Sequence, residues 1–381
     1  MSRADAETDA ARIERLRARY PRVAIVHEWL TIPGGSEDVV IELLKMFPQA
    51  ELFTTIYDPS PWPELITDRP VHASFLDRVP GAKRHYPKLL PLMNRAFRSF
   101  DLSDFDLVLS SNHASAKNVR TPPGALHVCY CHTPMRYAWD ESFLEGELGP
   151  TTRRLIRPLL SWLRRQDRKG SRGPDVFVAN SRHVAARIER CYGRPAEVVH
   201  PPVDVDHYLA LKHAPRDFYL VFGRVVPYKR VDLAVAACAR LGRPLKVAGG
   251  GRALEAAREL AGERTELLGR VSEDERDALL GGARALLFPG EEDFGIVPVE
   301  AQAAGVPVIA YGLGGATESV IDGRTGVLFA EQTADGLARA IERFEALTLN
   351  DDDARENARR FGRDRFRREI ADVIDRAAVD D

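Results

Sequence analysis

Two carboxylates on either side of a glycine turn could bind a ligand that carries several hydroxyl groups. Glu292 lies before this turn and Glu300 lies after it. The turn offers three backbone N–H donors, those of Phe294, Gly295 and Ile296. Carboxylates accept hydrogen bonds from hydroxyl groups, so the pattern suits a polyhydroxylated ligand better than a bare phosphate. The structural alternative is that Glu300 caps its own helix and that Glu291 to Asp293 form a solvated acidic turn.

Two cations follow another apolar run, at residues 219–222. They are Arg224 and Lys229. Arginine can bind two phosphate oxygens at once, and lysine supplies a compact charge. Gly223, before the arginine, would let a ligand approach the backbone closely. A lone Arg and Lys in a loop are most often surface charges, so their meaning depends on the other motifs.

Polar residues also follow apolar runs in the first half of the chain. They are His132, His113 and Lys117. Gly34 and Gly35 precede a helical pattern, and their small size would let the helix N-terminus approach an anion or an acceptor. His132 follows the run at residues 128–131. A single histidine is more often structural than ligand-binding, and that is the alternative here.

Apolar runs that predict buried strands must position all of these residues. In the first half they lie at 23–26, 107–110, 128–131 and 176–179. After Pro201-Pro202 the series restarts, with runs at 219–222, 245–248, 265–268, 285–288, 306–310 and 326–329. Strands that alternate with helical patterns predict parallel sheets covered by helices. We therefore expect two Rossmann-like units joined near residues 199–217, with ligands outside the carboxyl ends of the strands.

Taken in order over about residues 23–330, the motifs resemble the retaining glycosyltransferases of family 4. The motifs are Gly34-Gly35, Val178–Arg182, His200–Asp204, the Arg-x4-Lys site in Phe222–Arg230, Leu268–Val271 and the Glu-x-Phe-Gly-x4-Glu signature from Glu292 to Glu300. Within that family, Cys131–Asp140 and Val226–Ala234 are most similar to the GDP-mannose-dependent mannosyltransferases of polysaccharide and O-antigen assembly.

The resemblance implies an α/β GT-B fold, in which two Rossmann-like domains face a cleft. We expect an N-terminal acceptor-binding domain at residues 1–200 plus about 355–381. A C-terminal nucleotide-sugar-binding domain is expected at residues 201–354. The C-terminal helix crosses back to the first domain in this fold. The pattern near residues 359–376 is amphipathic, as such a helix should be, with Phe366, Ile370, Val373 and Ile374 on one side.

The resemblance also implies roles for the residues. The catalytic group consists of Arg224 and Lys229 at the leaving diphosphate, Glu292 at the donor sugar's hydroxyls and His132 at the transferred sugar. Donor binding falls to Glu300 at the ribose, the turn of Phe294, Gly295 and Ile296, Val271 with Arg270 at the base, and Gly34 with Gly35. Weaker candidates for contact with the acceptor are His113, Lys117, Arg136 and Tyr137, and Trp139 is a weak cleft candidate.

Composition excludes several classes of protein. The chain has 381 residues, more than a single core normally supports. Its 54 basic and 56 acidic residues give a net charge of −2, which does not suit a nucleic-acid-binding protein. We expect reduced, buried thiols at Cys129, Cys131, Cys191 and Cys238, which lack zinc-site spacing. Residues 1–22 are polar and no apolar segment is long enough for a membrane span, so a cytoplasmic protein is expected.

No metal or other cofactor is expected beyond the nucleotide-sugar co-substrate. Metal-dependent glycosyltransferases of the other common fold bind a divalent ion through an Asp-x-Asp pair. Asp204-Val-Asp206 has that spelling but follows the two prolines of the expected hinge. Arg224 and Lys229 would supply the positive charge instead. Gly249-Gly250-Gly251 could form a phosphate-side turn, although a helix cap explains the triplet nearly as well.

Two segments depart from the even charge balance. Arg78–Phe100 carries six basic residues and no acid, interleaved with Tyr86, Phe97 and Phe100. Arg153–Arg172 carries eight basic residues against Asp167 alone, with Ile156, Leu159, Leu160, Trp162 and Leu163 at helical spacing. Basic amphipathic segments can lie on an anionic membrane surface. The alternative is a solvated helix whose apolar face packs on its own domain.

The sequence therefore predicts a retaining glycosyltransferase that moves a hexose, first of all mannose from GDP-mannose, to a lipid-linked saccharide at the cytoplasmic membrane face. One alternative keeps the fold but uses a UDP-sugar. A nucleotide-sugar epimerase would need acid and base groups that these motifs do not supply. A non-catalytic nucleotide-sugar-binding protein is the third alternative. Retention of anomeric configuration is implied by the resemblance alone.

Overall fold

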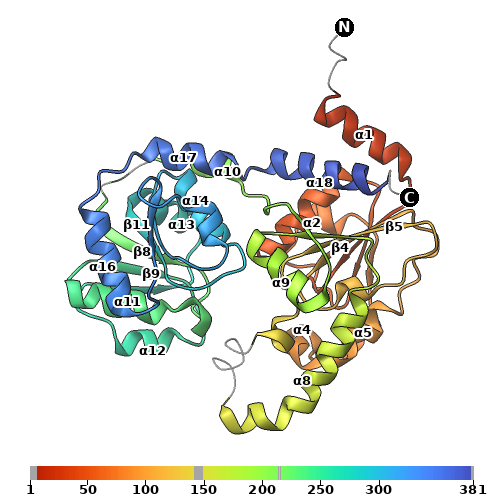
Figure 1. Cartoon of the computed structure of the whole chain (residues 1–381), viewed down its shortest axis with the longest axis horizontal. Helices are drawn as coiled ribbons and strands as arrows, with labels where there is room; N and C mark the ends of the chain where they lie inside the picture. Colours follow the sequence, from red (N-terminus) through yellow and green to blue (C-terminus); the bar gives the residue numbers. More distant parts are fainter. Residues whose placement is uncertain (1–6, 141–148, 213, 215, 379–381) are drawn as a thin grey trace. The chain divides into compact units, whose positions relative to one another are not determined.

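The structure is a computed structural model that describes residues 7–140, 149–212, 214 and 216–378. It divides into two compact units, Met1–Pro202 with Asp364–Asp381, and Val203–Arg363 (Figure 1). The point at which the chain returns to the first unit lies later than the expected residue 355, because helix α17 (Asp351–Arg359) packs on the second unit. Its Ala358 is buried in the same core as Val299 and Ala301 of α14 (Ile296–Ala303).

The first unit is a seven-stranded parallel sheet in the order β3-β2-β1-β4-β5-β6-β7. Its strands are β1 (Val23–His27), β2 (Glu51–Thr54), β3 (Val71–Ala73), β4 (Leu107–Asn112), β5 (Leu126–Cys131), β6 (Val176–Ala179) and β7 (Glu197–Val198). Its α-helices are α1 (Asp9–Arg19), α2 (Gly35–Met46), α3 (Glu64–Thr67), α4 (Ala82–His85), α5 (Leu90–Phe97), α6 (Arg136–Trp139), α8 (Pro150–Gly170), α9 (Arg182–Tyr192) and α18 (Arg363–Ala377). Short 3-10 turns are η1 (Phe75–Arg78), η2 (Tyr86–Leu89) and η3 (Ala116–Asn118).

Both faces of this sheet are covered, so its central strands β1, β4 and β5 are buried along their whole length. Val23 and Ile25 of β1 pack in a core that also holds residues of α1, α2 and α18. Ala24 and Val26 point the other way, into a core shared with α5 and α8. Successive side chains of a strand alternate between faces, which explains this division.

Helix α18 packs on the first unit, as the sequence predicts. Its apolar side, Phe366, Ile370, Val373 and Ile374, is buried in the core beneath α1 and α2. The Arg365 guanidinium of the same helix donates to the His200 carbonyl at 2.9 Å. The amphipathic pattern therefore identified both the helix and its buried face.

The second unit is a six-stranded parallel sheet in the order β10-β9-β8-β11-β12-β13. Its strands are β8 (Phe218–Phe222), β9 (Leu245–Ala248), β10 (Thr265–Gly269), β11 (Ala283–Phe288), β12 (Val308–Tyr311) and β13 (Gly326–Phe329). Its helices, with α14 and α17, are α10 (Val205–Leu209), η4 (Pro227–Lys229), α11 (Val231–Leu241), α12 (Leu254–Glu259), α13 (Glu273–Gly282), α15 (Ala316–Ser319) and α16 (Ala334–Glu345). All six apolar runs of this half form strands. The two parallel sheets, each wrapped by helices, confirm the predicted α/β architecture.

The four cysteines are free and buried, as expected from the sequence. Within the described residues, no helix combines the length and the apolar character needed to cross a bilayer.

Candidate active site

A lysine and a glutamate meet at the centre of the second unit's sheet. Lys229 Nζ lies 2.9 Å from Glu292 Oε1, and the two side chains are 16% and 18% exposed. Lys229 follows β8 and Glu292 follows β11, which are neighbours in the sheet. The strand order reverses between β8 and β11, so their carboxyl ends form a topological switch point. Ligands of open α/β sheets bind in the crevice at such a point.

Glycines allow the two loops to approach. A Cβ added to Gly290 would lie 2.8 Å from the Cα of Lys229. One added to Gly249, the first residue of the glycine triplet, would lie 1.8 Å from the carbonyl oxygen of Gly223. Gly249 also has a φ of +143°, which few other residues adopt. The triplet therefore packs the loop after β9 against the loop that carries Arg224.

Arg224 is exposed and lies on the same loop as Lys229. Its guanidinium donates to the hydroxyl of Tyr228 at 3.3 Å. The loop therefore places an exposed cation at the rim of the switch point and a paired, less exposed cation beside Glu292. Such an arrangement can stabilise negative charge on two neighbouring phosphate groups.

Glu300 has a partner that the sequence analysis missed. The hydroxyl of Tyr208, which is 4% exposed in α10, donates to the Glu300 carboxylate. Burial, followed by the charge of Glu300, raises the pKa of Tyr208, so the phenol keeps its proton. The Arg276 guanidinium lies 5.3 Å from the centre of the Tyr208 ring. Tyr208 therefore orients Glu300, and no motif in the sequence marks it.

The turn before α14 depends on its glycine. Gly295 precedes the helix with a φ of +84°, and an added Cβ would lie 2.8 Å from the Phe288 ring. Phe294 is buried against Phe361, with 5.5 Å between ring centroids, so its side chain is part of the core. Ile296 is the first residue of the helix. The Phe294 side chain is therefore part of the core, and a backbone role of the turn in donor binding stays a prediction.

The two predicted base-binding residues lie after β10. Val271 is half-buried against the core, and Arg270 is exposed. A Cβ added to Gly250 would lie 3.5 Å from Cγ of Arg270. These residues therefore belong to the same sheet edge as Arg224 and Glu292.

In the first unit, four side chains form a hydrogen-bonded chain that we call the histidine relay. Glu37 Oε1 lies 3.0 Å from His27 Nε2, and His27 Nδ1 lies 3.0 Å from Ser111 Oγ. Ser111 Oγ lies 2.8 Å from Nε2 of His132. His27 ends β1 and Ser111 lies in β4, the two strands between which this sheet's order reverses. The relay therefore occupies the switch point of the first unit.

The relay fixes the tautomer of His132. With His27 neutral, the Glu37 carboxylate accepts from its Nε2–H, and its Nδ1 accepts from the Ser111 hydroxyl. Ser111 then accepts from His132 Nε2–H, so His132 Nδ1 carries no proton. Burial, and then the nearby His113 and His27, hold the pKa of His132 well below its ordinary value. His132 is therefore neutral near pH 7, with Nδ1 as an acceptor.

The predicted glycine pair is linked to this relay. Gly34 precedes α2, and an added Cβ would lie 3.1 Å from Oε2 of Glu37. The Ser36 hydroxyl donates to the same oxygen at 2.9 Å. The sequence analysis identified Gly34, Gly35 and His132 but missed the residues that connect them, His27, Glu37 and Ser111. The sequence signal that could have revealed His27 and Ser111 is that each is a polar residue directly after an apolar run.

His113 lies beside His132, with 6.3 Å between ring centroids, and packs edge-on against Trp29. The carboxylate of Glu28 holds its loop by accepting from four successive backbone N–H groups, those of His113, Ala114, Ser115 and Ala116. Arg136 and Tyr137 lie in α6, where Tyr137 is half-buried against the core. These three remain candidates for contact with a ligand.

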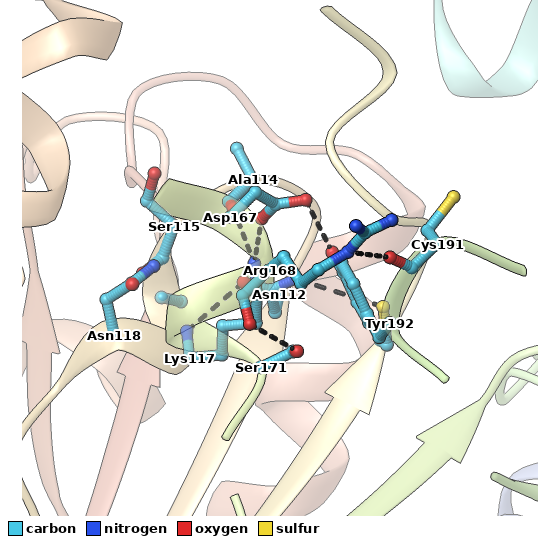
Figure 2. Close-up of polar contacts among 12 residues, drawn as sticks. Asn112, Ala114, Ser115, Lys117, Asn118, Asp167, Arg168, Ser171, Cys191 and Tyr192 are labelled. Carbon is cyan, nitrogen blue, oxygen red and sulfur yellow. Dashed lines mark hydrogen bonds and ion pairs between the residues drawn. The ribbon is translucent and has the colours of Figure 1, made fainter. Parts of the chain in front are cut away.

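Lys117 does not fit the predicted acceptor role, because its side chain is fully buried (Figure 2). Its ammonium group binds Asp167 of α8 and donates to the Ala114 carbonyl at 2.9 Å. Burial opposes the charge, but Asp167 outweighs it and raises the pKa of Lys117. Asp167 also accepts from Trp139 Nε1 at 2.7 Å and from the Tyr192 hydroxyl at 2.9 Å. Lys117 and Trp139 therefore serve the packing of α8.

The Asp-x-Asp spelling has a structural role as well. Asp204 pairs with Arg363 at 2.9 Å, and Asp206 lies in α10. Within the described ranges, no group of three or more His, Cys, Asp or Glu side chains gathers in a way that could hold a metal ion.

Comparison with known families matches both units. Residues 33–207 match the model of Glycosyltransferase Family 4, and residues 210–361 match the model of Glycosyl transferases group 1.

Curated relatives match part of the chain. A glycogen synthase of Mycobacterium tuberculosis is 30% identical over 213 residues, which are 51% of this chain and 50% of that protein. A D-inositol 3-phosphate glycosyltransferase of a Nocardioides species is 30% identical over 249 residues, 54% of each chain. A GDP-mannose-dependent alpha-(1-6)-phosphatidylinositol monomannoside mannosyltransferase of M. tuberculosis is 30% identical over 200 residues, 44% of this chain and 52% of that one. The chain thus spans about half the length of the curated relatives it matches.

Solved structures match over both units. Anabaena Alr3699/HepE in complex with UDP has a TM-score of 0.67 at 18% identity, over 93% of this chain and 99% of that one. The lipopolysaccharide outer core galactosyltransferase WaaB has a TM-score of 0.65 at 18% identity, again over 93% and 99%. These similarities establish the shared fold.

Proposed function

The chain belongs to the glycosyltransferases, with a family 4 domain followed by a group 1 domain in the GT-B fold, and from this premise we propose that it transfers mannose from GDP-mannose to a lipid-linked saccharide. The observation that carries the proposal is the Lys229–Glu292 pair at the switch point of the second sheet, with Arg224 on the same loop. Two cations at one crevice suit the diphosphate of a nucleotide-sugar donor.

Transfer breaks the bond between the anomeric carbon of the sugar and an oxygen of the diphosphate. Negative charge grows on the diphosphate as that bond lengthens, and Lys229 and Arg224 stabilise it. Because these cations are already held by the loop, little reorganisation is needed as the charge appears. An acceptor hydroxyl forms the new bond to the anomeric carbon, and its proton passes to the leaving phosphate oxygen.

Glu292 holds Lys229 in place before the donor arrives, because the two side chains are paired in this structure. In the complex, we propose that Glu292 accepts from hydroxyls of the donor sugar and Glu300 from those of the ribose. Tyr208 donates to Glu300 and so fixes the direction in which its carboxylate points. From the first unit, neutral His132 contacts the transferred sugar through Nδ1.

The mannose donor is supported by the similarity of Cys131–Asp140 and Val226–Ala234 to GDP-mannose-dependent enzymes. A UDP-sugar donor is the second candidate, because structures of the same fold include complexes with UDP and UDP-glucose. The charges at the diphosphate would serve either donor equally. The choice between GDP-mannose and a UDP-sugar therefore depends on how the protein binds the base and the sugar.

A thermal-shift panel tests the proposal without knowledge of the acceptor. The full chain is heated with GDP-mannose, GDP, UDP-glucose or UDP, with a chelator present. A ligand at 100 times its Kd stabilises by about 2.7 kcal/mol, enough to raise the unfolding midpoint by a few degrees. We expect shifts with GDP-mannose and GDP only. A shift with UDP ligands alone would overturn the assignment of GDP-mannose as the donor. No shift with any ligand would favour a non-catalytic protein.

We also propose contact with an anionic membrane, through the exposed face of α8. Leu155 and Leu159, one helical turn apart, are 75% and 43% exposed. Arg154 and Arg157 beside them are exposed too, whereas Asp167, the acid of the segment, is buried. In the Arg78–Phe100 segment, by contrast, Phe97 is buried and Tyr86 and Phe100 pack against the same core. In that segment the charged side chains and the exposed Leu92 could contact a membrane, whereas the aromatic rings could not.

Vesicle sedimentation tests the membrane proposal. The double variant Leu155→Gln/Leu159→Gln should weaken binding to vesicles that contain phosphatidylglycerol by about 30-fold, because inserting the leucines contributes on the order of 1 kcal/mol each. Leu313→Gln, at a leucine of the second unit that is also exposed, is the matched control. Equal binding by the wild type and the double variant would remove α8 from the proposal.

A further inference from the structure

A hollow of about 450 Å³ lies in the first unit between α5 and α8. It shares no residue with the histidine relay. Its lining residues are Asn94, Arg95 and Arg98 with Pro91 and Ser99, then Arg120 after η3, and Trp162 and Gln166 of α8. This volume is within the range of small-molecule sites in proteins.

Three arginines face this hollow without a counter-charge. No acidic residue lines it, and in the part of the chain that the structure describes, no hydrogen bond or ion pair engages the guanidinium of Arg95, Arg98 or Arg120. Other arginines of the first unit, such as Arg12, Arg15 and Arg17, pair with carboxylates. Like charges gathered around one space repel one another unless an anion enters it.

Asn94 lines the hollow and carries a polar atom without a hydrogen-bond partner among the described residues. Its side chain is 7% exposed, and its Oδ1 is buried without a hydrogen-bond partner among the described residues. Buried polar side chains in folded proteins are normally hydrogen-bonded, so an exception needs an explanation. A ligand that carries both an anion and a hydroxyl group could engage the carboxamide as donor and acceptor.

A buried hydrogen-bond network joins two of the segments that line the hollow. Asp167, the residue after Gln166, binds Lys117, which lies three residues before Arg120 (Figure 2). The Trp139 indole and the Tyr192 hydroxyl bind the same carboxylate. This buried network fixes α8 against the segment that carries Arg120, and so holds the backbone of two walls of the hollow. A preorganised site loses less entropy on binding.

We propose that this hollow binds a phosphate ester with a hydroxylated group, in the manner of a glycerophosphate. The guanidinium groups bind the phosphate oxygens in pairs, the geometry for which arginine is suited. Asn94 hydrogen-bonds the ligand, and the Trp162 ring covers its carbon skeleton. The phosphate ester could come from a soluble metabolite or from a phospholipid headgroup. The site requires no assumption about the donor or the reaction.

The test compares two probes on the full chain. The soluble probe is glycerol 3-phosphate, titrated by calorimetry at low salt. The lipid probe is vesicles of phosphatidylcholine with and without phosphatidylglycerol. The pocket variant is Arg98→Gln/Arg120→Gln, and the charge-matched control is Arg258→Gln/Arg339→Gln, at two exposed arginines of the second unit outside the hollow and α8. Circular dichroism checks that both variants fold. If the pocket variant does not fold, the single variant Arg95→Gln replaces it.

Binding of glycerol 3-phosphate that weakens about tenfold or more in the pocket variant and stays within about twofold in the control supports the site with a soluble ester. Binding to phosphatidylglycerol vesicles alone supports it with a lipid headgroup, provided that the pocket variant loses about tenfold more affinity than the control. The proposal is overturned if the wild type binds neither probe, or if the two variants lose equal affinity for both.

Discussion

At the scale of single residues, His132 takes its protonation state from the side chains behind it. The hydrogen bonds run from Glu37 to His27, from His27 to Ser111 and from Ser111 to His132, and each fixes which atom of the next side chain carries the proton. The lowered pKa of His132 keeps the ring neutral. Orientation of a histidine by a hydrogen bond to its other nitrogen is a recurrent device in enzyme sites.

Replacing Ser111 with alanine should therefore lower kcat by about tenfold, the loss expected for one neutral hydrogen bond of about 1.4 kcal/mol. The KM for the donor should change little, because the cations that bind it lie in the second unit. Steady-state kinetics measures both. Ser110→Ala is the matched control, since it removes a 2.9 Å hydrogen bond to buried His127 from the neighbouring position. Equal kcat losses in the two variants would assign Ser111 to packing alone.

At the scale of elements, the buried Lys117–Asp167 pair joins η3 to α8. The two residues are 50 positions apart in the sequence, and both side chains are fully buried. The attraction of the pair offsets the cost of removing both charges from water. Removing one charge leaves the other without its partner in the interior.

Asp167→Asn should lower the free energy of unfolding of the first unit by about 3–5 kcal/mol, the usual cost of breaking a buried pair. Lys117→Met should cost less, because Trp139 and Tyr192 still donate to Asp167. Urea unfolding followed by tryptophan fluorescence isolates this unit, since all four tryptophans, Trp29, Trp62, Trp139 and Trp162, belong to it. A loss below about 1 kcal/mol in Asp167→Asn would show that the carboxylate is not needed.

The sequence predicted elements more fully than it predicted contacts. Every strand of the second unit and the central strands of the first were predicted, because strands buried on both faces are apolar throughout. The strands β2, β3 and β7 were not predicted; β3 and β7 lie at the edges of the sheet and are only three and two residues long. Lys117 was assigned to a ligand because nothing in a sequence shows that its partner lies on a distant helix.

The roles of the site residues stay predictions. Arg224, Lys229 and Glu292 come from spaced motifs, and the structure brings Lys229 and Glu292 into contact after neighbouring strands. Tyr208 and Glu37 act by holding another side chain, and the fold alone brings such residues together. Spacing can reveal groups that follow one strand, but not supporting groups that come from separate elements.

At the scale of the whole molecule, buried histidines make stability depend on pH. Burial lowers the pKa of His127 to about 3, and the pKa of His132 is also well below its ordinary value. An unfolded histidine binds a proton below about pH 6.5, whereas these two remain neutral in the folded chain. The unfolded state therefore binds more protons, and stability is lost as the pH falls below about 6.5.

Between pH 6.5 and 5.0, each of these histidines should reduce the free energy of unfolding of the first unit by about 1.6 kcal/mol in all. Urea unfolding at the two pH values, followed by tryptophan fluorescence, measures the slope. His127→Gln should have a smaller slope than the wild type, and His85→Gln, at an exposed histidine, should have the same slope. A wild-type slope of zero would contradict neutral, buried histidines.

The central claim is that Lys229 and Glu292 form the donor end of a glycosyltransferase, and release of GDP from GDP-mannose tests it most directly. We would measure the slow hydrolysis of the donor by the purified chain, in the presence of a chelator, for the wild type, Lys229→Met and Lys246→Met. The account predicts GDP release that falls about 100-fold or more in Lys229→Met and is unchanged in Lys246→Met, whose lysine lies over the Phe218 ring. Equal rates for the wild type and Lys229→Met, or release that requires a metal, would contradict it.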